Sequence, residues 1–77
     1  MPEIVRFSNC KICIYADDHH PPHFHIRGRG WDVSVDLRTL VVIRGSGVQR
    51  DIAEAVEWAT MNRAALYATW GKLNERD

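Results

Sequence analysis

The sequence lacks an excess of charge of either sign, a long apolar segment and a second pair of cysteines. Ten lysines and arginines balance ten aspartates and glutamates in 77 residues, which excludes a domain that is basic throughout. No apolar run approaches the roughly 18 residues of a membrane span, and the N-terminus lacks the basic-then-apolar layout of a signal peptide. We therefore expect a soluble, cytoplasmic protein without membrane contact.

The two cysteines, Cys10 and Cys13, have the C-x-x-C spacing of half a zinc site or of a redox pair. No second C-x-x-C follows, and an extended strand would turn the two side chains to opposite faces. We expect both cysteines to be reduced and structural.

The chain is long enough for one domain only, residues 1–77. A domain of this size buries only about 60% of the surface that its unfolded chain exposes, so its stability alone is marginal. We expect a protein partner or a second copy of the chain to complete it.

Residues 1–45 predict about five short antiparallel strands. A two-residue loop at Ser8 and Asn9 would pair Val5 with Ile12. A second turn at Arg29 and Gly30 would connect two more strands, and residues 40–43 are apolar on both faces of a last strand.

Residues 46–75 predict a helix. Apolar side chains recur at steps of three and four to about Leu73, and residues 46–49 fit a capping box. One long helix is the economical interpretation, with a break near residues 60–62 as the alternative. The predicted fold is α+β, an antiparallel β-meander packed against one long C-terminal helix.

The most specific local feature is a cluster of all four histidines within residues 19–25, in a loop stiffened by Pro21 and Pro22. On a strand, His23 and His25 share one face, because successive side chains alternate. The predicted hairpin places His23 opposite Asp36, and a carboxylate beside an imidazole fixes its tautomer and raises its basicity. His23 and His25 are predicted to begin a stripe of side chains on this face that continues through Arg27, Arg29 and Trp31.

Three functional interpretations of this segment compete with a structural one, in which the histidines pin the stiff loop. A divalent metal such as Zn, Ni, Mn or Fe would be held by imidazoles and a carboxylate, with the candidate ligands Asp18, His19, His23 and His25. A metal-independent ribonuclease would use acid–base chemistry, with the catalytic candidates His23, His25 and Asp36. Simple binding of an anion or of nucleic acid would use His19, Arg27, Arg29 and Trp31.

The segment D-H-x-P-P-H-F-H, from Asp18 to His25, together with the turn at residues 28–30 and a late E-W…L…W helix, resembles the short prokaryotic proteins called Domain of Unknown Function 4160. The family's marks fall on Asp18, His19, Pro21, Pro22, His23, Phe24, His25, Gly45, Glu57, Trp58, Leu66 and Trp70. The resemblance implies a protein often encoded beside another short protein, as in a toxin–antitoxin-like pair. It implies no established activity.

Charge is unevenly distributed along the chain. Residues 27–50 carry five basic and two acidic side chains, a net of +3, whereas residues 51–77 carry three and five, a net of −2. We therefore predict an accessory or regulatory module whose His-rich loop and basic hairpin bind a partner or an anionic ligand. The alternative is a small RNA-cleaving or metal-dependent phosphodiesterase that uses the histidine cluster.

Overall fold

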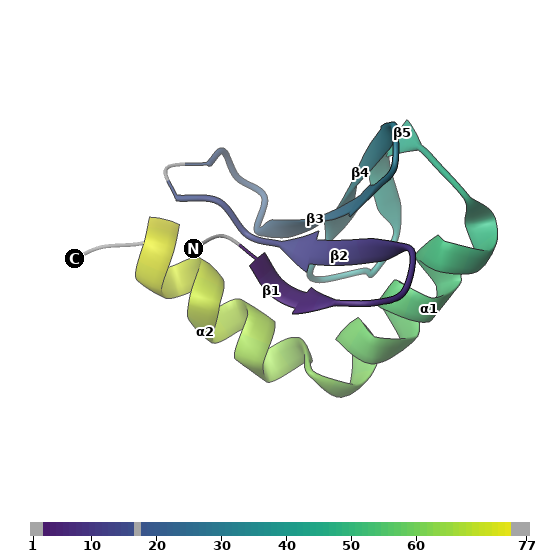
Figure 1. Cartoon of the computed structure of the whole chain (residues 1–77). Coiled ribbons are helices and arrows are strands. Elements are labelled where there is room, and N and C mark those ends of the chain that lie inside the picture. Colours follow the sequence, from purple (N-terminus) through teal and green to yellow (C-terminus); the bar gives the residue numbers. More distant parts are fainter. Residues whose placement is uncertain (1–2, 17, 75–77) are drawn as a thin grey trace.

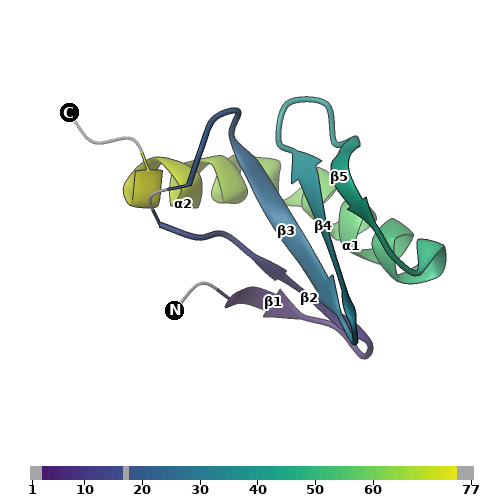
Figure 2. The same cartoon turned by 90° about the horizontal axis from the view of Figure 1, so that it is seen from above.

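The computed structural model describes residues 3–16 and 18–74 and contains one open antiparallel sheet covered by helices on one face (Figures 1 and 2). Its strands are β1 (Glu3–Arg6), β2 (Cys10–Cys13), β3 (His23–Gly28), β4 (Trp31–Asp36) and β5 (Val42–Ser46). They neighbour one another in sequence order. Helices α1 (Gln49–Met61) and α2 (Arg63–Asn74) follow. The α+β meander predicted from the sequence is confirmed.

The predicted register of both hairpins is also confirmed. Val5 pairs with Ile12 in the first hairpin, which a bulge interrupts between residues 3 and 5. In the second, His23 lies opposite Asp36 and His25 opposite Ser34. Gly30 supplies the positive φ of 79° that this turn requires, a conformation that glycine adopts without strain.

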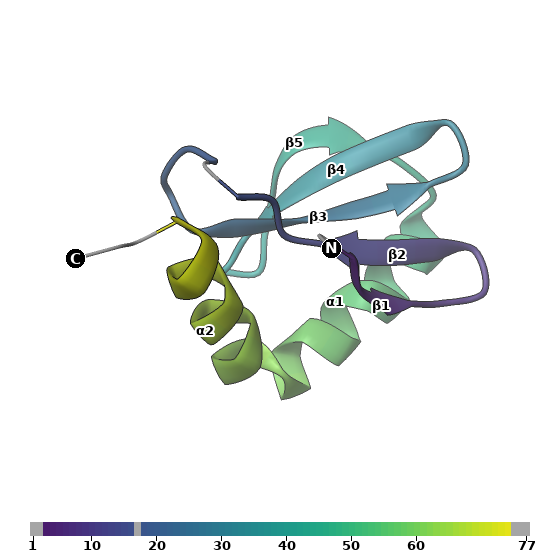
Figure 3. The same cartoon turned by 60° about the vertical axis from the view of Figure 1, so that its left-hand side comes forward.

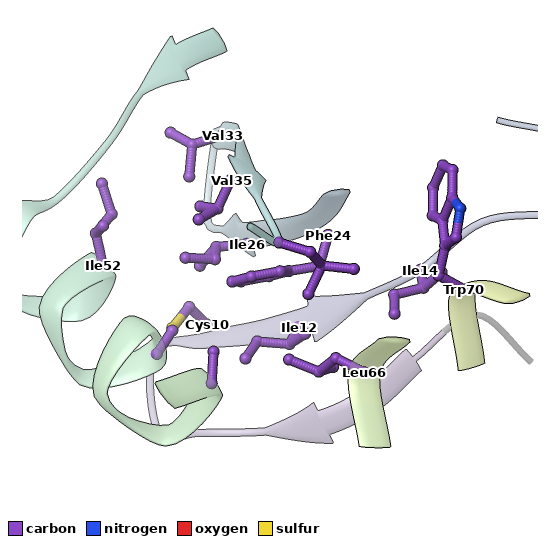
Figure 4. Packing of buried hydrophobic residues seen from close by; sticks show 13 residues of the cluster. Cys10, Ile12, Ile14, Phe24, Ile26, Val33, Val35, Ile52, Leu66 and Trp70 are labelled. Atoms are coloured by element: carbon purple, nitrogen blue, oxygen red, sulfur yellow. The ribbon is translucent and has the colours of Figure 1, made fainter. Parts of the chain in front are cut away.

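The core lies between the sheet and the two helices. Phe24, Ile26, Val33 and Val35 point from β3 and β4 toward the helices and are almost completely buried (Figure 4). From α2, Leu66 and Trp70 enter the same cluster. Because β3 alternates, His23, His25 and Arg27 are left on the opposite face of the sheet.

The prediction of one long helix is wrong, because the chain leaves the helical path at Asn62. This residue has φ −123° and ψ 24°, and its side-chain amide donates a hydrogen bond of 2.9 Å to the carbonyl of Trp58. Short polar side chains compete with the helical backbone for such acceptors. The break at residues 60–62 that the sequence left as an alternative is therefore found. Neither helix is long and apolar enough to cross a membrane.

The predicted capping box at residues 46–49 is wrong as well. Ser46 is the last residue of β5 and pairs with Asp32, so it is not available as a cap. Helix α1 begins after Val48, whose side chain makes no capping hydrogen bond. The intervening Gly47 lies against the Trp31 indole, where a Cβ atom would overlap the ring.

The last strand begins at Val42, and its neighbouring apolar side chains are exposed. Val41 is 59% exposed and Ile43 is 48% exposed. Strand β5 is an end of the sheet, so its outer edge has no neighbouring strand within the described part of the chain. That a partner protein or a second copy covers this strand stays a prediction.

The turn between β4 and β5 is held by the buried carboxylate of Asp36. Its Oδ1 atom accepts hydrogen bonds from the backbone N–H groups of Arg38 at 2.6 Å and Thr39 at 3.3 Å. Arg63 of α2 donates to the carbonyls of Leu37, at 2.9 Å, and Arg38. Burial raises the pKa of the Asp36 carboxyl, but the hydrogen bonds and the Arg38 charge outweigh it and lower that pKa.

We expect the stabilisation by Asp36 to disappear in acid. Because its pKa is lower in the folded than in the unfolded chain, the ionised carboxylate stabilises the fold above pH of about 4 and loses this effect as pH falls further. Asp36→Ala should cost about 1 to 3 kcal/mol at pH 7, because two partly buried backbone N–H groups lose a charged acceptor. Urea unfolding at pH 7 and in strong acid measures the difference from wild type, which should shrink in acid. An equal difference at both pH values would contradict this role.

Candidate metal-binding site

The His-rich loop is fixed to the end of α2 (Figure 3). The side-chain amide of Asn74 donates to the carbonyl of Tyr15 at 3.0 Å and accepts the backbone N–H of Asp18 at 2.6 Å. The backbone N–H of His19 donates to Oδ1 of Asp18 at 3.0 Å. These contacts orient the Asp18 carboxylate and engage one of its oxygens within the loop.

The other oxygen of Asp18 meets two imidazoles from β3. Its Oδ2 atom lies 3.1 Å from Nε2 of His23 and 3.2 Å from Nε2 of His25. The three ligand atoms all lie within 4.8 Å of one another. We call these three residues the Asp–His cluster.

Each imidazole ring of the cluster also has a hydrogen-bond partner at its Nδ1 atom. Nδ1 of His23 lies 2.7 Å from the carbonyl of Pro21, which can only accept, so Nδ1 carries a proton and donates. Nδ1 of His25 lies 3.3 Å from a carboxylate oxygen of Asp32. The His23 ring also packs at 5.2 Å against the Trp70 indole, and the His25 ring at 4.8 Å against Tyr15.

In this arrangement the acceptor atoms of His23 and Asp18 face each other. With its proton on Nδ1, a neutral His23 presents a lone pair at Nε2, and this lone pair faces a carboxylate oxygen. Two such acceptors repel each other unless a positive charge lies between them. That charge can be a proton or a metal ion.

The Asp18 carboxyl is acidic despite its partial burial. Burial raises its pKa, but hydrogen bonds from His25 and from the His19 backbone, together with the charges of His23 and His25, lower it further than burial raises it. The net effect is a pKa below the ordinary value of an aspartate. The carboxylate is therefore ionised near neutral pH, as a metal ligand must be.

Two of the three separations between ligand atoms fit a first-row divalent metal, while the two imidazole nitrogens, which lie within 4.8 Å of each other, would approach one another on binding. Ligand atoms about 2.1 Å from an ion and about 90° to 110° apart are separated by about 3.0 to 3.4 Å. The two separations from Asp18 to the imidazoles, 3.1 and 3.2 Å, fall within this range. Two histidines and one carboxylate leave coordination positions open for water or substrate.

The cluster opens into a cavity of about 470 Å³. Besides the cluster and Asp32, its walls are formed by His19, His20, Ser34, Ile43 and Arg44. The cavity thus offers space and one guanidinium beside the open side of the cluster.

The other two histidines of the loop, of which only His19 is a candidate from the sequence, lie beside the cluster and not in it. His19 is exposed and lines the cavity, but it is not one of the three converging ligands. The His20 ring packs edge-on against Trp70 at a centroid distance of 5.8 Å. Of the four candidate ligands predicted from the sequence, the structure therefore brings three together, Asp18, His23 and His25.

The remaining candidates are placed elsewhere. The Asp36 carboxylate binds its own turn, although its backbone pairs with His23. Trp31 does not continue the stripe of His23 and His25, because the turn returns it to the core-facing side with Val33 and Val35. Arg27 and Arg29 line a second cavity.

Three supporting residues were not among the candidates from the sequence. Asn74 lies 56 residues from Asp18 in the sequence, and nothing in its neighbourhood signals this contact. Arg44 reaches the cavity from the edge strand, and its sequence context shows only a solvated charge. Asp32 could have been found, since the predicted hairpin already placed it one pair beyond His25 and Ser34.

The cysteines take no part in the cluster. Both are buried and reduced. The Cys10 thiol donates toward the carbonyl of Asp51 at 3.7 Å on the helix-facing side, and burial raises the pKa of both thiols. The structural role predicted for them agrees with this placement.

These features define a small α+β protein with an open meander, two helices on one face and a carboxylate–imidazole cluster at a loop. The chain belongs to the family described as domain of unknown function (DUF4160), whose model matches residues 9–71. The resemblance noted in the sequence is thereby confirmed. No curated protein and no solved structure matches the chain.

Proposed function

We propose that the protein binds one divalent first-row metal ion through Oδ2 of Asp18 and the Nε2 atoms of His23 and His25. The observation that supports this most directly is the combination of two features. Both imidazoles turn Nε2 toward the same carboxylate oxygen, and both Nδ1 atoms face an outer acceptor. Histidines that bind metals almost always have such an outer partner, which fixes the ring and its tautomer.

The three-ligand set also suggests how the ion would be used. An ion held by these three residues would border the cavity, where a water or an anionic group could complete its coordination. Arg44 in the same cavity wall adds a positive charge that would favour an anion. A metal-dependent phosphodiesterase, the enzymatic alternative drawn from the sequence, would use the same ion and the same arginine.

The broader role we propose is that of an accessory module that works with a protein partner or a second copy of the chain. The exposed Val41 and Ile43 at the edge strand support it, since paired aliphatic side chains there suit contact with another protein. A toxin–antitoxin-like pairing is one form of this proposal and rests on the family resemblance.

Metal binding by the wild-type chain tests the proposal. Protein prepared without an affinity tag and stripped with chelator should bind one Zn, Mn, Ni or Fe(II) ion per chain in a calorimetric titration. At a free metal concentration 100 times the Kd, the fold gains about 2.7 kcal/mol, so the melting temperature should rise by about 10 °C or more.

The histidine ring signals in NMR provide the internal control. The Nε2 resonances of His23 and His25 should shift on addition of the metal, whereas those of His19 and His20 should stay nearly unchanged. If no metal raises the melting temperature, or if only His19 and His20 respond, the Asp–His cluster is a structural ion-pair network and the proposal fails.

A further inference from the structure

A second and larger cavity lies at the opposite end of β3 from His23. The turns β1–β2 and β3–β4 meet at this end of the sheet (Figures 2 and 3). The cavity has a volume of about 740 Å³, and the first turn of α1 contributes to its wall. It shares no lining residue with the cavity of the Asp–His cluster. Binding of a ligand in this cavity would therefore not require the proposed metal ion.

The walls of this cavity are strongly basic. Five cationic side chains line it, and we call their cavity the basic pocket: Arg6, Lys11, Arg27, Arg29 and Arg50. The only acidic residue among the lining residues is Asp51, so the lining has a net charge of 5 − 1 = +4. The whole chain has a net charge of zero. Positive charge is therefore concentrated here.

Some of this charge is balanced within the molecule and some is not. Glu3 lies 2.8 Å from Arg6 and 3.8 Å from Lys11, and Asp32 lies 3.2 Å from Arg27. Arg29 and Arg50 are exposed and form no ion pair with any residue that the structure describes. These two guanidiniums are free to bind an external anion.

The shape and charge of the pocket indicate the class of ligand. Arg6, Lys11 and Arg27 are direct cross-strand neighbours and form a row across β1, β2 and β3. Arg29 from the second hairpin and Arg50 from α1 add two further cations to the lining. Cations spread in this way match a row of phosphates better than a single one. A concave cavity also suits a flexible strand that can bend into it more than a stiff, convex duplex.

The wall between the hairpins is rigid. Trp31 lies between Gly28 and Gly47, where a Cβ atom on either glycine would overlap the indole. The close packing fixes the ring and the turn that carries Arg29 next to it. Phe7 adds a half-buried apolar side chain to the lining.

We propose that the basic pocket binds the phosphate backbone of single-stranded nucleic acid, with Arg29 and Arg50 as the principal phosphate contacts. Guanidiniums suit this role because they remain charged and bind phosphate oxygens in pairs. Because the chain is neutral and the pocket lining has a net charge of +4, the remaining residues have a net charge of 0 − 4 = −4, which disfavours phosphate binding elsewhere.

Fluorescence anisotropy with a short, fluorescein-labelled single-stranded RNA tests the proposal. The buffer contains chelator, so that the result does not depend on the metal site. The logarithm of the affinity should fall linearly with the logarithm of salt concentration, by about 0.7 for each neutralised phosphate. The double variant Arg29→Gln, Arg50→Gln should bind at least about tenfold more weakly and show a salt slope shallower by about 1 to 2.

The matched control removes two positive charges outside the basic pocket. The double variant Arg38→Gln, Lys72→Gln has the same change in net charge, lies outside both cavities and should keep the wild-type affinity. Equal losses in both double variants would overturn the proposal, because the effect would then come from net charge alone. Absence of RNA binding would overturn it too, as would preference for a duplex or for free ATP over the single strand.

Discussion

The Trp70→Ala variant should lose about 3 to 5 kcal/mol of unfolding free energy, the range measured for removal of large buried aromatics. Trp70 is 1% exposed and belongs to the cluster that joins α2 to the sheet. For a 77-residue domain, total stability is on the order of 4 to 12 kcal/mol. The variant should therefore be partly unfolded at 37 °C, as seen in urea denaturation followed by circular dichroism.

Two variants control for the position and for the ring. Tyr67 lies on the same helix and is 36% exposed, so Tyr67→Ala should cost far less. Trp70→Phe keeps most of the buried apolar surface and should recover a large part of the stability. If Trp70→Ala cost no more than Tyr67→Ala, the described packing of α2 on the sheet would be wrong.

The same residue connects the fold to the Asp–His cluster. The Trp70 indole packs against the His23 ring at 5.2 Å and against the His20 ring at 5.8 Å. Trp70→Phe should therefore stay folded but loosen the orientation of His23. Through these contacts we expect a residue of the helical core to affect a site on the other face of the sheet.

The local parts of the fold could be predicted because short-range chemistry determines them. The period of two in β3 and β4 and the Arg29–Gly30 turn are sufficient to set His23 opposite Asp36, as found. The shared face of His23 and His25 follows from the same alternation. The placement of the two histidines of the Asp–His cluster could therefore be predicted from the sequence.

The parts that could not be predicted have two causes, a local competition for a backbone acceptor and a contact between distant segments. Asn62 breaks the helix because its amide finds the Trp58 carbonyl, a choice that propensity alone does not decide. Arg63 is a polar residue within the apolar stripe of the helical segment. Its guanidinium donates to the carbonyls of Leu37 and Arg38 in the β4–β5 turn, 26 and 25 residues away in the sequence. Such a partner has no local signal in either segment.

The position of the basic pocket also could not be predicted from the charge of one sequence segment. Counting along the chain located the excess in residues 27–50, but the cavity also draws Arg6 and Lys11 from the first hairpin. The fold also places Arg44, one of the basic residues of that segment, in the other cavity. A charge sum over contiguous residues could therefore indicate a basic region but not the pocket.

Removal of any ligand of the Asp–His cluster should weaken metal binding by more than about 100-fold, since loss of an outer partner alone costs about 10-fold to 100-fold. Asp18→Asn, His23→Ala and His25→Ala are the three ligand variants. Asp18→Asn keeps the size of the side chain and its hydrogen bond from His19, so it should remain folded even if His23→Ala does not. Calorimetric titration with Zn measures the loss.

The order of effects across a graded series distinguishes a metal site from a structural ion-pair network. Asp32→Asn leaves all three ligands in place but weakens the contact behind His25, so its affinity should fall by about 10-fold to 100-fold. His19→Gln changes an exposed histidine that lines the same cavity without belonging to the cluster, and it should bind the metal as wild type does. If His19→Gln weakened binding as much as His25→Ala, the ion would be held by the loop histidines instead. If Asp18→Asn bound as tightly as wild type, the converging oxygen would not be a ligand.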